Sequence, residues 1–229
     1  IKIGRKIAIG LLAAAMAVIP SVSSVMANPH YDRRDTVAEE ERVPAAGASG
    51  TEKARSKVSP NAWKKINGVC YNGSGEVIPG AITRGIDVSE WQGNIDWAQV
   101  KKSGIDFAFV RISYGANRLD KTYDANMTKA ELAGVPVGTY VYSLALNTET
   151  ALKEAQVAIE QMQGYKVSYP VVFDLEYSKA SNLSRQEVSK LALTFCNEVR
   201  RAGYYPMVYC NVNWYNNYVD WSMLSRMDV

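Results

Sequence analysis

The stretch YPVVFDLE, residues 169–176, is an apolar run that leads directly into two carboxylates. Its β-branched and aromatic residues predict a strand over residues 171–175. Other short apolar runs predict further strands at residues 85–89, 107–113, 137–144 and 205–211. We therefore expect five strands between residue 85 and the C-terminus.

Helical patterns separate these strands. Apolar residues recur at helical spacing in 149–163 and 185–201, and shorter helices are expected at 95–102 and 123–133. Ser184, with Glu187 three residues later, is typical of a capping box. Strands that alternate with helices imply parallel β-α units with both faces of the sheet covered, so the predicted class is α/β, either a barrel or an open sheet.

Asp174 and Glu176 are two residues apart on a predicted strand, so their side chains should share a face, with Cα atoms roughly 6.6 Å apart. Repulsion between carboxylates this close should raise one pKa and leave the other group ionised. One protonated acid beside one anion suits the protonation of a glycosidic oxygen and the stabilisation of an oxocarbenium-like charge. We interpret the pair as catalytic, the alternative being a strand-end cap or salt bridge. Asp87, in the first predicted strand, could by itself be an N-cap or turn residue.

Four segments together resemble glycoside hydrolase family 25, the muramidases. They are GIDVSEWQGNIDW (85–97), FAFVRISYG (107–115), AGVPVGTYVYS (133–143) and YPVVFDLE (169–176). The resemblance runs from about residue 81 to the C-terminus. It implies an irregular TIM-like β/α barrel that cleaves the β-1,4 bond between N-acetylmuramic acid and N-acetylglucosamine in peptidoglycan. We expect the barrel to be incomplete in this chain, because such a barrel closes with about eight strands.

The resemblance also implies roles for the carboxylates. Glu176 matches the general acid, and Asp174 matches the carboxylate that orients the substrate's N-acetyl group in a retaining, substrate-assisted mechanism. Asp87 matches a carboxylate that hydrogen-bonds within the site. Arg111 and Tyr114 stand where the family usually has Lys and Glu, which puts substrate preference in doubt more than reaction type.

Further side chains are expected to contact the glycan. Aromatic rings near the strand ends could stack on sugar faces, although packing in the barrel core is the alternative for at least half of the tyrosines. Trp97, at helical spacing, is expected in the core. The predicted substrate-binding residues are Trp91, Arg111, Tyr140, Tyr142, Tyr209 and Asn211.

The composition excludes several other classes of protein. The formal charge of +3 is too small to argue for nucleic-acid binding. His30 is the only histidine, which rules out a histidine-dependent triad or a multi-histidine metal site, and no metal or cofactor is expected. An odd number of cysteines, Cys70, Cys196 and Cys210, cannot complete a disulfide framework, and the last two are expected to be buried.

The N-terminal part predicts export and wall association. Residues 1–27 combine a basic start, an apolar run and small residues, as in a signal peptide, an uncleaved membrane anchor being the alternative. Residues 28–60 are charged and small and predict a linker. Residues 61–80 predict one hairpin around the Gly-rich turn at 73–75, which resembles a lone wall-binding repeat or serves as a collar on the catalytic domain at 81–229.

We accordingly expect a secreted, wall-associated and monomeric lysozyme whose partner is the peptidoglycan glycan strand, with no stable membrane span after cleavage of the signal. Two other functions stay open. A chitinase-like glycosidase would also place acidic groups at strand ends of a barrel. A non-catalytic barrel could bind wall glycan without cleaving it.

Overall fold

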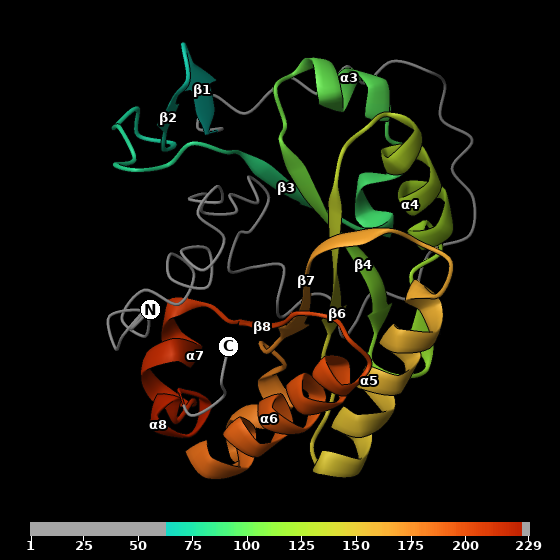
Figure 1. Ribbon diagram of the computed structural model, residues 1–229. Helices are drawn as coiled ribbons and strands as arrows, with labels where there is room; N and C mark the ends of the chain where they lie inside the picture. Colours follow the sequence, from blue (N-terminus) through green and yellow to red (C-terminus); the bar gives the residue numbers. More distant parts are fainter. Residues whose placement is uncertain (1–62, 226–229) are drawn as a thin grey trace, which may run out of the picture.

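The computed structural model describes residues 63–225, and the predicted signal peptide and linker lie outside them. Its main sheet has five parallel strands in the order β3-β4-β6-β7-β8, with the short β5 antiparallel to β4 (Figure 1). The strands of this sheet are β3 (Gly85–Val88), β4 (Phe107–Tyr114), β5 (Arg118–Leu119), β6 (Val137–Tyr142), β7 (Val167–Asp174) and β8 (Pro206–Tyr209).

The helices fall between these strands, as the sequence pattern predicts. The longest, α6, spans Arg185–Arg201, and Ser184 and Glu187 form the predicted capping box at its start. The others are α3 (Trp97–Lys102), α4 (Tyr123–Leu132), α5 (Thr148–Met162), α7 (Val212–Asn217) and α8 (Trp221–Leu224), with 3-10 turns η2 (Glu90–Gln92) and η3 (Ser178–Asn182). The fold class is therefore α/β with a parallel sheet, as predicted.

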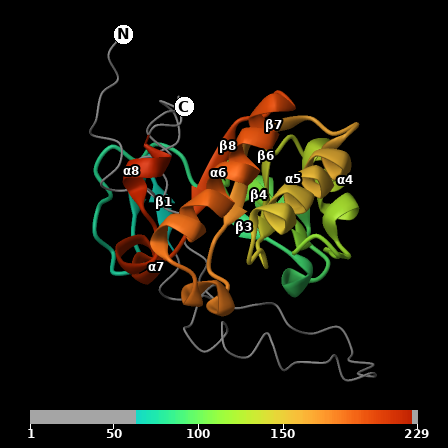
Figure 2. The same ribbon diagram turned by 90° about the horizontal axis from the view of Figure 1, so that it is seen from below.

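The described helices pack against one face of the sheet only, whereas the alternation predicted cover on both faces. Figure 2 shows α4, α5 and α6 side by side along this face. Each parallel strand pairs with the next parallel strand in the chain, and right-handed crossovers then place the connecting helices α3 to α6 on the same side. The core between sheet and helices contains fully buried Val110, Phe173 and Phe195, and Trp97 packs in it as predicted.

The opposite face, which we call the helix-free face, has a separate cluster of buried side chains. The Phe107 ring stacks on Tyr169 with centroids 4.8 Å apart and meets Phe109 edge-on at 5.9 Å. Val172 and Met207 complete the cluster. This layer of rings lies below the carboxyl ends of the strands and supports the residues there.

Gly85 makes room for that layer, since a Cβ at this position would lie 2.1 Å from Cε2 of Phe107. We expect Gly85→Ala to lower the free energy of unfolding by about 1–3 kcal/mol, the usual cost of overpacking. Adding Phe107→Leu should recover part of that loss, because the three nearest atoms all belong to this ring. Urea unfolding of both single variants and the double variant measures the coupling, and strictly additive losses would contradict the clash.

The structure has a hairpin at residues 64–71, with a turn other than the predicted one at 73–75. Strands β1 (Lys64–Ile66) and β2 (Val69–Tyr71) pair antiparallel through Asn67 and Gly68, whose φ values are 50° and 81°. The Gly-rich turn at 73–75 instead leads from β2 to a single bridge between Tyr71 and Val77. Asn-Gly is the stronger two-residue hairpin signal, because both positions need positive φ.

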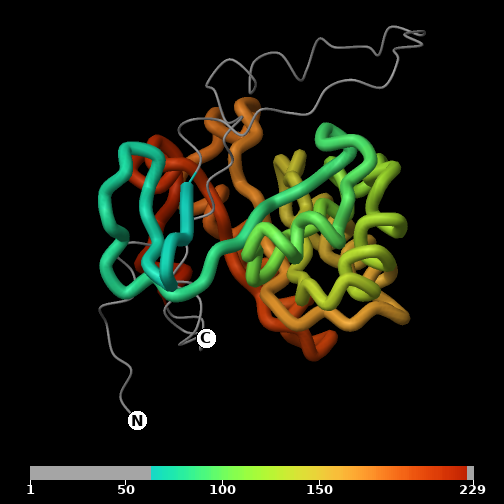
Figure 3. Tube along the Cα trace, turned by 90° about the horizontal axis from the view of Figure 1, so that it is seen from above, coloured from blue at the N-terminus to red at the C-terminus, as the bar shows by residue number. Residues whose placement is uncertain are grey.

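The hairpin is joined to the α/β domain by polar contacts. Lys65 Nζ lies 2.9 Å from Asp106 Oδ2, and Arg84 Nη1 donates to the Trp63 carbonyl at 3.2 Å. Figure 3 shows the hairpin set to one side of the strands and helices of the α/β domain. Its likeness to a wall-binding repeat stays a prediction.

The cysteines are all buried and unbridged, as expected for Cys196 and Cys210. Across residues 63–225, no helix combines the length and the apolar character needed to cross a membrane.

Candidate active site

The predicted carboxylates lie near the carboxyl ends of β3 and β7, two strands of the main sheet that β4 and β6 separate. Asp87 lies on β3 opposite Phe109 of β4, and Asp174 ends β7 opposite Tyr209 of β8. Glu176 follows two residues later, just beyond the strand. Asp174 and Glu176 are 9% and 4% exposed, so both acids are withdrawn from bulk water.

Glu176 is a buried carboxyl group with a raised pKa. Burial raises its pKa to about 7, and the side chain and backbone of Asn211 partly offset that rise. Within residues 63–225, neither carboxyl oxygen accepts a hydrogen bond of regular geometry. The sequence argument attributed a raised pKa in this pair to repulsion between the carboxylates, whereas the main cause at Glu176 is desolvation.

Asp87 is a strand residue rather than a cap, and Ser89 caps the following 3-10 turn instead. Burial raises the pKa of Asp87 to about 6, and hydrogen bonding to its own backbone and the Arg111 charge act against that rise. Asp87 therefore titrates near the pH at which Glu176 is still protonated.

Two tyrosines indicate that the three acids face a common space. Burial raises the pKa of Tyr209, and the charges of Glu176, Asp174 and Asp87 raise it further. The pKa of Tyr140 is raised by burial and by Asp87 and Asp174. Both tyrosines pack against the cluster on the helix-free face, and these charge effects place Asp87 and Asp174 near both tyrosines and Glu176 near Tyr209.

Arg111 lies within the protein rather than at its surface. Its Nε donates to Asp120 Oδ2 at 2.9 Å, and its Nη2 lies 3.3 Å from Glu90 Oε1. The Asp120 side chain is fully buried and also accepts the Glu90 amide at 2.8 Å. This geometry favours a positioning role beside Asp87, and substrate binding by Arg111 stays a prediction.

Sequence reasoning missed Asp120 and Glu90. A charged arginine inside an apolar strand pattern needs a buried counter-charge, and that requirement was the signal that could have located Asp120. Asn211 has two roles that were also missed. Its Oδ1 accepts a hydrogen bond from the Trp214 amide at 3.0 Å, as the N-cap of α7. Its side chain and its backbone also act on Glu176, whose pKa they lower.

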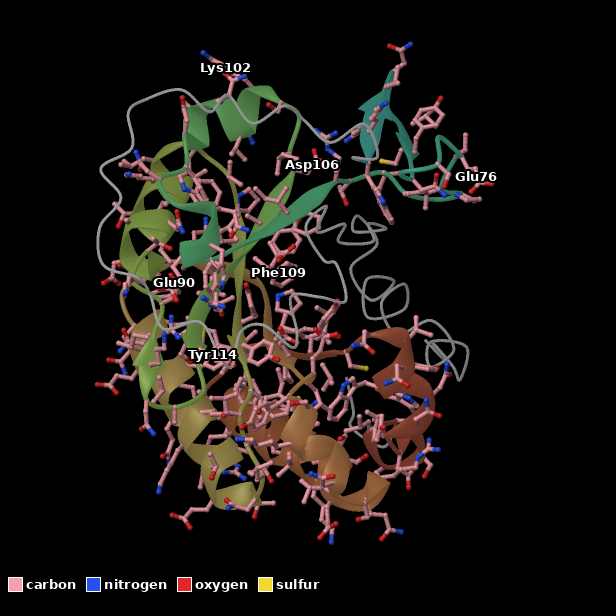
Figure 4. All side chains as sticks on the ribbon, turned by 180° about the vertical axis from the view of Figure 1, so that it is seen from behind. Glu76, Glu90, Lys102, Asp106, Phe109 and Tyr114 are labelled. Atoms are coloured by element: carbon pink, nitrogen blue, oxygen red, sulfur yellow. The ribbon has the colours of Figure 1, made fainter. Side chains whose placement is uncertain are left out.

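The remaining predicted substrate-binding residues differ in accessibility. Trp91 is 55% exposed, on the turn that follows Asp87. Tyr142 is buried and stacks on Tyr114 with centroids 4.8 Å apart. Figure 4 shows Phe109 and Tyr114 on β4, with the Glu90 turn beside them.

A further buried carboxylate, Glu154, lies on the helix side of the sheet. Its Oε2 accepts from the Ser143 hydroxyl at 2.7 Å, and its Oε1 accepts from the Leu144 amide at 2.8 Å. The Ser143 amide in turn donates to the Asp174 carbonyl at 2.9 Å. Glu154 thus holds the segment after β6 next to the candidate site, and burial raises its pKa to about 7.

These buried acids predict stability that falls as pH rises. Asp87, Glu154 and Glu176 have pKa values of about 6, 7 and 7 when folded, above the ordinary 3.8 to 4.5, so the folded protein holds more protons than the unfolded chain. The free energy of unfolding should therefore decrease from about pH 5 to pH 8, by a few kcal/mol. Urea unfolding at both pH values tests this.

Glu154→Gln should reduce the difference in the free energy of unfolding between pH 5 and pH 8, because it removes one of the titrating groups. The exposed Glu131→Gln is the matched control and should leave the difference unchanged. If the free energy of unfolding depended equally on pH in the wild type and in Glu154→Gln, the raised pKa of Glu154 would be contradicted.

Among the described residues, no group of His, Cys, Asp and Glu side chains is arranged to hold a metal ion. The fold is that of an α/β protein, and its buried carboxylates near the strand ends form a candidate acid–base site. The family model "Glycosyl hydrolases family 25" matches residues 86–228, and the chain belongs to this family.

Individual relatives agree with this assignment. Lysozyme M1 from Streptomyces globisporus is 28% identical over 141 residues, covering 58% of this chain and 48% of that protein. The modular autolysin LytC from Streptococcus pneumoniae matches with a TM-score of 0.60 at 25% identity, covering 68% of this chain and 39% of that one. The structure of LytC with a synthetic peptidoglycan ligand matches with a TM-score of 0.56 at 27% identity, covering 64% of this chain and 37% of that one.

A family 25 glycosyl hydrolase from Bacillus anthracis matches with a TM-score of 0.54 at 27% identity, covering 60% of this chain and 64% of that one. The chain spans about half the length of the curated lysozyme it matches.

Proposed function

We propose that the protein is a secreted, cell-wall-associated lysozyme that hydrolyses the β-1,4 bond between N-acetylmuramic acid and N-acetylglucosamine in peptidoglycan. The observation that carries this proposal is Glu176, a buried carboxyl with a pKa of about 7 beside Asp174, within the segment that matches family 25. The LytC complex with a peptidoglycan ligand supports this substrate class.

Glu176 would act first as the general acid. Its proton passes to the glycosidic oxygen as the bond from that oxygen to the sugar's anomeric carbon breaks, and the N-acetylglucosamine side leaves as an alcohol. A group with a pKa near 7 is largely protonated at slightly acidic pH and becomes a usable base once it has given up its proton.

The substrate's own N-acetyl group would act as the nucleophile. Its carbonyl oxygen bonds to the anomeric carbon, and Asp174 holds and charge-stabilises that group. Water then attacks the same carbon and gives its proton to Glu176, while the bond between the carbonyl oxygen and that carbon breaks and restores the N-acetyl group. Two displacements at the same carbon retain its configuration. Asp87, beside Tyr140 and Arg111, would hydrogen-bond within the site.

The wider architecture belongs to the same proposal. We infer that the parallel strands β3, β4, β6, β7 and β8 belong to an irregular β/α barrel, because they pair in chain order with the connecting helices on one side. Residues 81–229 would be the catalytic domain, the 61–80 hairpin a wall-binding-like unit or collar, and residues 1–60 a signal peptide and linker. A monomer would suffice, since the acids come from one chain.

Reducing-end analysis tests the activity. The full-length protein is incubated with purified peptidoglycan and, in parallel, with chitin. New N-acetylmuramic acid reducing ends from peptidoglycan are expected. Activity on chitin alone would replace the proposal with a chitinase-like glycosidase, and binding without new reducing ends would replace it with a wall-binding barrel.

A further inference from the structure

One row of paired residues crosses the sheet at the level of Asp174. On one side Asp174 pairs with Tyr209 of β8, and on the other with Tyr142 of β6. Tyr142 pairs with Tyr114 of β4, and Tyr114 pairs with Arg118 of β5. Directly paired residues of neighbouring strands point to the same face, so this row brings an acid, three aromatic rings and a cation into line.

The contacts at one end of the row are continuous. The Tyr142 and Tyr114 rings stack with centroids 4.8 Å apart and planes within 6°. The Arg118 guanidinium lies over the Tyr114 ring, 5.7 Å from its centroid. From Asp174 to Arg118 the row spans three strand spacings, about 14 Å, so its cationic end lies well beyond the position of a single bound sugar.

Arg118 is oriented outward at this end. Its Nη2 is anchored by Glu90 Oε1 at 2.5 Å, yet its side chain is 51% exposed. The side chains of Glu90 and Asp120 are only 12% and 0% exposed, so the negative charges of the network point inward and the positive charge faces solvent. An anchored guanidinium with spare N–H groups is well suited to a carboxylate.

We propose that Arg118 is the anion-binding end of the Asp174–Tyr142–Tyr114–Arg118 row and recognises a carboxylate carried by the glycan strand away from the cleaved bond. This rests on the proposed function and adds a specificity determinant to it. The carboxylate can belong to a stem peptide or to the free lactyl group of a muramic acid, and the experiment separates the two. Tyr114 connects the row to the cation, because its ring stacks on Tyr142 and also lies under the Arg118 guanidinium.

The test compares three soluble glycan strands in the full-length protein: one with stem peptides, one stripped of peptides so that lactyl carboxylates are free, and one stripped and amidated. Arg118→Met should raise KM about fivefold for the strand that carries the recognised carboxylate, with kcat nearly unchanged. Arg118→Met should leave KM for the amidated strand unchanged. Arg118→Lys should recover part of the affinity, because it keeps the charge but not the fork.

The matched control is Arg201→Met, which removes another exposed, ion-paired arginine, on α6. It should leave KM unchanged for all three strands. An effect of Arg118→Met on the stem-bearing strand alone identifies the stem peptide, and one on the stripped strand alone identifies the lactyl group. Equal effects on all strands, or none, would overturn the proposal, whereas a wild-type protein that cleaves no strand would instead overturn the proposed function.

Discussion

Replacing Glu176 with Gln should reduce peptidoglycan hydrolysis by at least about 10²-fold, the scale of general acid catalysis. Glutamine keeps the size of the side chain but cannot give up a proton to the glycosidic oxygen. Glycan binding should persist, because no other contact is removed. Initial rates from new reducing ends, measured beside a wall-binding assay, give both quantities.

Folding of the variant can be checked independently. Because the pKa of Glu176 is raised on folding, ionisation of this carboxyl destabilises the native state as pH rises toward 7 and above. The Gln variant should therefore be at least as stable as wild type at pH 8. The exposed Glu160→Gln on α5 is the matched control and should keep full activity. Near-normal turnover by the Glu176 variant would show that another group is the acid.

The second large effect concerns the N-acetyl group. If that group is the nucleophile and Asp174 holds it, strands that lack the acetyl should be cleaved far more slowly, and Asp174→Asn should lower the rate by about 10²-fold. The first product should be the β-anomer. Asp174→Asn should add little further loss on de-N-acetylated strands, since its target is already absent.

Early-time NMR of the released reducing ends distinguishes the mechanisms. A first-formed α-anomer would require direct attack by water, with Asp174 as the base. Undiminished cleavage of de-N-acetylated strands would also exclude participation of the acetyl group. Exposed Asp124→Asn, on α4, serves as the control for loss of a carboxylate elsewhere.

Local patterns predicted the secondary structure well. The limits of α6 and its capping box follow from hydrophobic spacing and a Ser-x-x-Glu signature, which depend on neighbours within one or two turns. The predicted strands match the observed ones to within a few residues. The short β5 and helices α7 and α8 were missed, because elements this short have too few residues to show a period.

In the candidate site, too, local patterns predicted some features and the tertiary structure added others. Local patterns in the chain were enough to predict the class, the family resemblance and the candidate carboxylates Asp87, Asp174 and Glu176, because residues at strand ends can be recognised without the fold. The tertiary structure decided that burial, more than repulsion, raises the pKa of Glu176, since desolvation depends on what surrounds a group. It also decided that Arg111 is held by Asp120, and that Arg118 aligns with Asp174 across four strands, because both arise from pairing between distant segments.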